Sequence, residues 1–227
     1  MEVAAAISAT DPFDPGYRLL RRVFDRAEIT ALAPVLARIP SSAAGRRWAG
    51  HELVALLQSP PMQPILRKLA ELLPDMAILR AVAFRKDADA NWFVPAHQDR
   101  SIPVPSVALP PGFDHVTRKP DGWQAEAPVA LLAKMRNCRI FVDRATIEDG
   151  PLEVLPGSHR RGRIEQAEIP TIAGHWVPLI GEVGDAVILS PLLLHRSRRA
   201  TDPSGRRVLQ LELIPSEMAE ALGLSAC

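Results

Sequence analysis

Cysteine, excess charge of either sign and long apolar runs are all scarce in this sequence. Two cysteines, Cys138 and Cys227, occur among 227 residues, which is too few for a disulfide framework. No apolar run approaches the roughly 20 residues that a membrane-spanning helix needs. Together with the lack of a recognisable signal peptide, these absences predict a cytoplasmic protein with no membrane partner.

The charge is almost balanced. Lys and Arg number 27, Asp and Glu number 26, and the net charge is +1, with both signs interspersed. This balance argues against nucleic acid or another charged polymer as a partner. Apolar residues make up 47% of the chain, as in an ordinary globular core, and no low-complexity linker interrupts it. We therefore predict a single domain over residues 1–227, and the sequence leaves its oligomeric state open.

Residues 1–75 are predicted to be mostly helical. Asp25 and Glu28 form a capping-box pattern, in which each side chain bonds the other residue's backbone N–H. Apolar residues then recur at helical spacing, and Pro74 ends the last helical pattern. The predicted elements are an N-terminal arm at 1–24 and helices at 26–38, 51–57 and 62–73.

Residues 76–215 are predicted to form a β core whose short strands are separated by Gly and Pro. Helices followed by strands are typical of a mainly β fold with flanking helices, here a jelly roll preceded by N-terminal α-helices. The Pro-containing segment 105–128 is predicted to be a loop, and its length makes it a candidate lid. The predicted strands are 76–86, 97–104, 138–143, 150–155, 184–189 and 206–213, with a helical turn at 130–135.

The most informative motif is His97-Gln98-Asp99, with His195 far downstream. Two imidazoles and one carboxylate are the ligand set of the facial triad that binds non-haem Fe(II) and leaves positions open. On an extended strand, side-chain alternation places His97 and Asp99 on the same side. Taken singly, each of these residues is more often an ordinary core or surface residue, so the ordered set carries the prediction.

Arg206 follows His195 by eleven residues and lies on a predicted strand. Its planar guanidinium can bind a carboxylate bidentately while the other end of the same molecule chelates the metal, which indicates a dicarboxylate cosubstrate. Ser197 shares a strand face with His195 and can donate a hydroxyl to that carboxylate. The alternative for Arg206 alone is a solvated charge beside Arg207.

Six segments, two of which contain the triad, follow one another along the chain. They are Phe84-Arg-Lys86, Asn91–Asp99, Arg139–Asp143, Asp149–His159, Pro191–His195 and Arg206–Leu209. In content and spacing they resemble the phytanoyl-CoA dioxygenase-like (PhyH-like) branch of the Fe(II)/2-oxoglutarate-dependent oxygenases, over most of the chain from about Phe84 to Leu213. Asp149 replaces the usual Asn before Gly150-Pro151, a substitution that a turn tolerates.

The resemblance implies a double-stranded β-helix, which is a distorted jelly roll of cupin type, with Fe(II) at one mouth on His97, Asp99 and His195. It implies that O₂ and 2-oxoglutarate are consumed, that succinate and CO₂ are released, and that a small-molecule metabolite is hydroxylated. Related halogenases carry a small residue in place of the carboxylate. Asp99 therefore predicts oxygenation, or a related desaturation or ring closure, in place of halogenation.

The resemblance also implies where the cosubstrate 2-oxoglutarate binds. Its carboxylate is placed on Arg206, with Ser197 as a helper, and Lys86 matches a position that faces the same pocket. Strand alternation puts Arg80 on the same face as Lys86, so Arg80 is a further candidate. Arg80 and Phe84 stand where related enzymes often carry amides, which changes the hydrogen bonding of the pocket.

The implied substrate is a small metabolite. Arg80, Lys86 and Arg139 favour an anionic or amino-acid-like compound, although 2-oxoglutarate is itself an anion and accounts for them equally well. Arg139 either lines the pocket or pairs with Asp143. Two other interpretations stay open: a cupin-like metalloenzyme that does not use 2-oxoglutarate, and a non-catalytic binding protein on the same fold, against which the intact triad argues.

Overall fold

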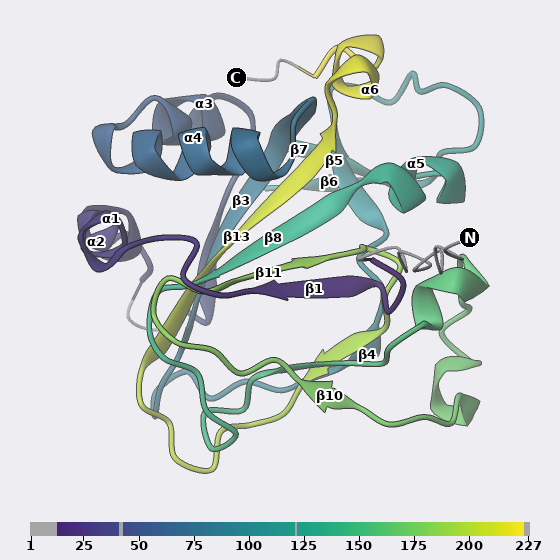
Figure 1. Ribbon diagram of the computed structural model, residues 1–227. Helices are drawn as coiled ribbons and strands as arrows, with labels where there is room; N and C mark the ends of the chain where they lie inside the picture. Colours follow the sequence, from purple (N-terminus) through teal and green to yellow (C-terminus); the bar gives the residue numbers. More distant parts are fainter. Residues whose placement is uncertain (1–12, 41–42, 121, 225–227) are drawn as a thin grey trace, which may run out of the picture.

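Two antiparallel β-sheets face each other at the centre of the protein, and helices lie outside the larger sheet (Figure 1). This computed structural model describes residues 13–40, 43–120 and 122–224. The larger sheet has the strand order β1 (Tyr17–Leu20), β11 (Ala186–Leu189), β8 (Arg136–Phe141), β13 (Arg206–Pro215), β3 (Met76–Lys86) and β2 (Gly45–Trp48). The smaller sheet has the order β10 (Val177–Pro178), β9 (Leu152–Val154), β12 (His195–Ser197) and β4 (Val94–His97).

Apolar side chains fill part of the space between the two sheets. Phe141 and Val208 of the larger sheet belong to the same buried cluster as Val154 of the smaller sheet. Because strand side chains alternate, residues two apart share this inner face, so Arg206 and Gln210 flank Val208 along β13. The predicted jelly roll is confirmed, and its inner face carries both the core and several polar side chains.

Helices cover the outer face of the larger sheet (Figure 1). Leu32, Leu56 and Ile65 of the helical region lie in one buried cluster with Ile140 and Leu209 of the sheet. The larger sheet is therefore buried on both faces, and its polar inner residues must find partners inside the fold. The helices are α1 (Arg26–Ala31), α2 (Ala33–Leu36), α3 (Gly50–Leu57) and α4 (Gln63–Leu72), with the 3₁₀ turn η1 (Pro60–Met62) before α4.

The single helix predicted over 26–38 is wrong, because the helix ends after Ala31 and α2 begins at Ala33. Pro34 has no backbone N–H to donate to the carbonyl one turn earlier, so the first helix cannot continue through it. The predicted capping box is confirmed. The Glu28 N–H donates to Asp25 Oδ1 at 2.9 Å, and the Asp25 N–H donates to Glu28 Oε2 at 2.8 Å.

The N-terminal part also contains two strands that the helical prediction for 1–75 missed. β1 lies in the segment predicted as an arm at 1–24 and pairs with β11, while residues 1–12 lie outside the described ranges. β2 pairs with β3 at the other edge of the same sheet. Both are four-residue edge strands, and pairing with a distant strand, which no local pattern reveals, defines them.

A third sheet occupies most of the segment predicted as a loop at 105–128. It has the order β5 (Ser101–Val104), β7 (Gly122–Glu126) and β6 (Asp114–Lys119). The loop prediction is therefore wrong for the residues of β6 and β7, which pair with each other, while β7 also pairs with β5. The continuous strand predicted at 97–104 is also wrong, because β4 ends at His97 and β5 begins in another sheet. The role of this segment as a lid stays a prediction.

The other predicted elements occur close to their expected places. The strand predicted at 76–86 is β3, and the strand predicted at 206–213 is β13, which extends to Pro215. The predicted helical turn at 130–135 is α5 (Val129–Lys134). The remaining elements are α6 (Ser216–Ala221) and the 3₁₀ turns η2 (Ser158–Arg161) and η3 (Ile169–Thr171). None of the helices in the described ranges is long and apolar enough to cross a membrane.

At Gly150 the backbone passes very close to the backbone of residues 198–200. Its φ is +57°, and a Cβ added there would lie 2.5 Å from the carbonyl oxygen of Arg198. Gly205 also has a positive φ, +84°, but a Cβ there would meet nothing within 4 Å. Alanine at Gly205 would thus test the free-energy cost of the left-handed conformation alone, and alanine at Gly150 would add the cost of the clash.

We predict that Gly150→Ala lowers the free energy of unfolding by about 3 kcal/mol, from the left-handed conformation together with the clash. Gly205→Ala is expected to cost about 1 kcal/mol, from the conformation alone. Chemical denaturation of both variants checks this prediction. Equal losses for the two variants would contradict the close approach at Gly150.

Candidate metal centre

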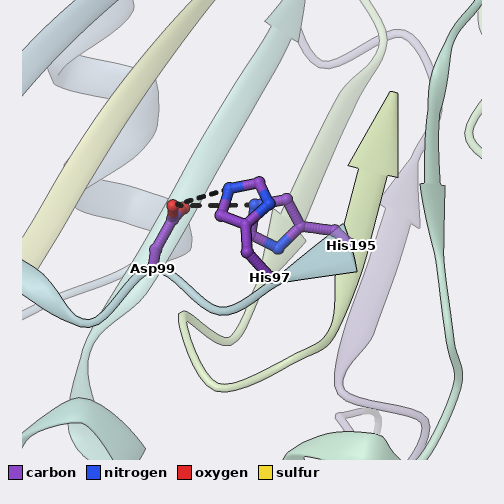
Figure 2. A group of neighbouring side chains, drawn as sticks. All are labelled: His97, Asp99 and His195. Carbon is purple, nitrogen blue, oxygen red and sulfur yellow. Dashed lines mark ion pairs between the residues drawn. The ribbon is translucent and has the colours of Figure 1, made fainter. Parts of the chain in front are cut away.

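His97, Asp99 and His195 come together at the open edge of the smaller sheet (Figure 2). His97 ends β4 and lies directly opposite His195, the first residue of the neighbouring strand β12. Asp99 Oδ1 lies 3.7 Å from His97 Nε2 and 3.6 Å from His195 Nε2, and one ligand atom from each residue lies within 4.8 Å of the others. The three side chains thus converge on one point, as a shared ion requires.

Both imidazoles are held in the form that can bind a metal. His97 Nδ1 lies 2.9 Å from the carbonyl oxygen of Pro95, and His195 Nδ1 lies 2.9 Å from that of Leu193. A carbonyl only accepts, so in each ring Nδ1 carries the proton and donates it. Nε2 of each ring faces Asp99, which raises the pKa of His195, and Nε2 is the atom that would bind a metal once it has lost its proton.

Asp99 is fixed by two contacts that leave one oxygen available. Asn137 Nδ2 donates to Oδ2 at 2.8 Å, while the backbone N–H of Asp99 donates to the Pro191 carbonyl at 2.9 Å. Burial alone would raise the pKa of this carboxyl, but His195 and His97 hold it well below its usual range. Asp99 is therefore a carboxylate whose Oδ1 faces both imidazoles.

Gln98 positions the segment between the two ligands. Its Nε2 donates to the carbonyls of Leu192 (2.6 Å) and Gly162 (2.8 Å), and its Oε1 accepts from the Ile164 N–H at 2.9 Å. Asp99 therefore lies beyond the end of β4, and its orientation comes from these bonds and not from strand alternation. The expectation that His97 and Asp99 share a face of one continuous strand is wrong, although their convergence is observed.

The donor set fits a divalent transition metal. Two imidazole nitrogens and one carboxylate oxygen, which leave positions open for other ligands, form the pattern of non-haem Fe(II) sites. Each ligand also has the supporting hydrogen bond that such sites use: a carbonyl behind each imidazole and an amide behind the carboxylate. The sequence-predicted triad is thus brought together, and its three residues can hold the ion.

Arg206 and Lys86 lie deeper on the inner face, directly opposite each other on β13 and β3. Both are buried, and Lys86 Nζ donates to Ser197 Oγ at 2.8 Å and to the Gly150 carbonyl at 3.0 Å. Burial and the nearby charges of Arg206 and Arg139 lower the pKa of Lys86 to about 7. Ser197 thus lies next to Lys86 and donates its own proton to the Gly150 carbonyl.

Arg206 is 3% exposed, and its Nε has no hydrogen-bond partner in the described ranges. Within the same ranges, no carboxylate lies within salt-bridge distance of its guanidinium. Burial lowers the pKa of Arg206, while Asp149 and Asp143 at longer range raise it. A buried cation without a bonded partner is costly unless a ligand supplies the anion, so Arg206 fits a carboxylate-binding role.

Arg80 has its partners within the protein. Its guanidinium donates to Glu212 on the paired strand at 2.8 and 2.9 Å and to the Ser101 carbonyl at 3.2 Å. Arg80 lies at the metal end of the inner face, whereas Lys86 and Arg206 lie six residues further along their strands. Arg80 therefore lines the space beside the triad, and its predicted contact with 2-oxoglutarate stays a prediction.

The two alternatives for Arg139 separate in the structure. Asp143 pairs with Arg207, with Nε 2.7 Å from Oδ2, while Arg139 Nη1 donates to Gln210 Oε1 at 3.0 Å. Arg139 is therefore an inner-face residue and not the partner of Asp143.

A cavity of about 620 Å³ opens beside the triad. It is mostly polar, and β6, β7 and the turn between them supply Lys119, Pro120, Gln124 and Glu126. Arg206 does not line this cavity but a separate hollow of about 840 Å³ at the far end of β13. The triad and Arg206 therefore border two different hollows.

Asn137, Gln98, Gln210 and Glu212 were not among the residues singled out from the sequence. Each is a polar residue within or beside an apolar strand, and each is buried. A polar residue in an apolar strand therefore predicts a buried hydrogen bond, because a buried polar side chain must have a partner. The partner itself cannot be read from the sequence, because it lies on another strand.

The facing sheets and the convergent triad define a jelly-roll protein with a candidate two-histidine, one-carboxylate metal centre. The family model of phytanoyl-CoA dioxygenase (PhyH) matches residues 14–208. Because this match spans most of the chain, the protein belongs to the PhyH family, as the sequence segments indicated. A comparison with curated protein sequences finds no match.

Solved structures share the fold at low sequence identity. HygX from Streptomyces hygroscopicus with iron bound is 14% identical, with a TM-score of 0.59, and the match covers 90% of this chain and 84% of HygX. EvdO2 from Micromonospora carbonacea var. aurantiaca complexed with 2-oxoglutarate is 18% identical, with a TM-score of 0.58 and coverages of 95% and 94%. SnoK, a non-haem α-ketoglutarate-dependent carbocyclase from nogalamycin biosynthesis, is 18% identical, with a TM-score of 0.57 and coverages of 95% and 88%.

We predict that Asn137→Ala weakens the binding of Ni(II) or Fe(II) by about 10- to 100-fold, because Asp99 loses the amide that orients it. Asn91→Ala is the matched control, since the Asn91 side chain bonds only the backbone of Ala200. Calorimetric metal titration at one fixed pH checks both variants. Equal affinities for Asn137→Ala and the wild type would contradict the orienting role.

Proposed function

We propose that this protein is an Fe(II)- and 2-oxoglutarate-dependent oxygenase that hydroxylates a small metabolite. The observation that carries the proposal is the combination of the convergent triad with the buried Arg206 of the larger sheet, whose Nε has no hydrogen-bond partner among the described residues. A metal site alone would suit any cupin-like metalloprotein. A buried guanidinium that lacks an anion points to a carboxylate-bearing cosubstrate.

His97, Asp99 and His195 would hold Fe(II), which when bound with 2-oxoglutarate supplies the activation of O₂ for substrate oxidation. Arg206 would bind the carboxylate far from the metal. Lys86 would add positive charge beside it, and Ser197 would hold Lys86 in place through their hydrogen bond. The protein's own part is to fix these groups on paired strands before any ligand arrives.

The cavity beside the triad supports a small, polar substrate. Its volume of about 620 Å³ is in the range of small-molecule sites. Arg47 and Lys119 both line it, and neither forms an ion pair among the residues that the structure describes. We propose that they recognise an anionic or amino-acid-like group of the substrate, and that the β6–β7 hairpin acts as the lid predicted for 105–128.

Asp99 supports oxygenation, or a related desaturation or ring closure, over halogenation. The carboxylate occupies the third protein position at the metal, where a smaller residue would leave room for a halide. SnoK, which shares the fold, is a carbocyclase, so ring closure is the alternative outcome. Which bond is oxidised then depends on the pose that the cavity imposes on the substrate.

We predict that the Fe(II)-loaded protein converts 2-oxoglutarate to succinate in the presence of O₂, and that Asp99→Ala reduces turnover by at least about 10³-fold, because the iron loses its carboxylate ligand. His175→Ala is the matched control, since this exposed histidine lies outside the triad. Succinate formation is measured with and without candidate anionic metabolites. Undiminished turnover by Asp99→Ala would contradict the site, and no turnover by the wild type would favour a metalloprotein that does not use 2-oxoglutarate.

A further inference from the structure

Three buried basic side chains share the inner face of the larger sheet. Lys86, Arg139 and Arg206 are 1%, 4% and 3% exposed, and within the described ranges none of them has a carboxylate partner. The triad next to this face contains one carboxylate, that of Asp99. This face therefore carries an excess of positive charge that an anion of more than one charge would balance.

Arg139 lies between the triad and Arg206. On β8 it follows Asn137 by two residues on the same face, and Asn137 donates to the carboxylate of Asp99. Its register partner on β13 is Gln210, and Arg206 lies four residues from Gln210 on the same face. The guanidinium carbon lies 5.1 Å from the ring centroid of Phe84, within cation–π distance.

The protein satisfies little of the hydrogen-bonding capacity of Arg139. A guanidinium has five N–H donors, and the single acceptor recorded for Arg139 in the described part of the chain is the neutral Oε1 of Gln210, at 3.0 Å. Burial and the charge of Arg206 lower the pKa of Arg139 to about 9, whereas Asp99 raises it. Arg139 thus feels both the metal carboxylate and Arg206, one on each side.

We propose that Arg139 is a second cosubstrate-binding residue, which holds the carboxylate next to the keto group of 2-oxoglutarate while Arg206 holds the distal carboxylate. The inference rests on the proposed function, and it assigns a role to a residue that the triad and Arg206 do not account for. Two guanidinium groups at either end of the molecule would make the site selective for dianionic 2-oxo acids.

A purely structural role for Arg139 makes a different prediction. If the contacts with Gln210 and Phe84 serve the fold, Arg139→Gln should lower the melting temperature of the ligand-free protein. If Arg139 serves to bind an anion, removing its charge from the ligand-free protein removes a desolvation cost. The ligand-free variant should then be at least as stable as the wild type. The melting temperature is thus a readout that does not depend on turnover.

The binding experiment uses the Ni(II)-loaded protein and two probes, 2-oxoglutarate and 2-oxopentanoate, which has a methyl group in place of the distal carboxylate. We expect Arg139→Gln to weaken the binding of both probes by about 10- to 100-fold, because both carry the carboxylate next to the keto group. Arg206→Gln is expected to weaken 2-oxoglutarate by a similar factor and to leave 2-oxopentanoate unchanged.

Two further variants serve as controls. Arg136→Gln makes the same change on the opposite face of β8, where Arg136 donates to the Ala133 carbonyl, and should leave the affinity for both probes unchanged. Arg139→Lys keeps the charge without the planar fork and should fall between Arg139→Gln and the wild type. All variants should bind Ni(II) as the wild type does, which shows that the triad is intact.

The outcomes separate the two levels of the proposal. Failure of the wild type to bind 2-oxoglutarate would overturn the proposed function itself. Wild-type binding with unchanged affinities in Arg139→Gln would overturn only the role of Arg139. A loss by Arg139→Gln that affects 2-oxoglutarate but spares 2-oxopentanoate would move Arg139 to the distal carboxylate, and a lowered melting temperature with unchanged binding would make it structural.

Discussion

The antiparallel pairing of β4 with β12 is the constraint on which the candidate site depends. It sets His97 directly opposite His195, and it brings the chain after His97 close enough for the Asp99 N–H to bond the Pro191 carbonyl. A slip of one residue in this register would turn one imidazole to the other side of the sheet. The hydrogen bonds of Gln98 secure the register from outside the strands, by joining the segment between the ligands to Leu192 and Gly162.

Strand alternation also places several basic side chains on the inner face of the larger sheet. Lys86, Arg139 and Arg206 lie on the same face of three neighbouring strands, with Lys86 opposite Arg206 and Arg139 opposite Gln210. Buried charges without a bound counter-ion oppose folding, so the fold carries a cost that an anionic ligand would offset. Arg80 differs in having Glu212 as an internal partner, and it forms part of the wall beside the metal end.

The sequence predicted the parts of the structure that local patterns encode. Strand β3, the capping box at Asp25 and the triad follow from alternation, from side-chain spacing and from a rare combination of ligand types. The failures are non-local. β7 is a strand because it pairs with both β5 and β6, and Asn137 reaches Asp99 from another sheet. Pro34 was a local signal for the break between α1 and α2, but the apolar periodicity on both sides concealed it.

The most direct test of the account is the absorption spectrum of the Fe(II)-loaded protein, recorded without oxygen as 2-oxoglutarate is added. Chelation of the iron by the keto acid gives a metal-to-ligand charge-transfer band in the visible region. The account predicts that this band appears and saturates in the wild type. Tight Fe(II) binding with no band at saturating 2-oxoglutarate would contradict it, because the triad would then serve a metal centre without this cosubstrate.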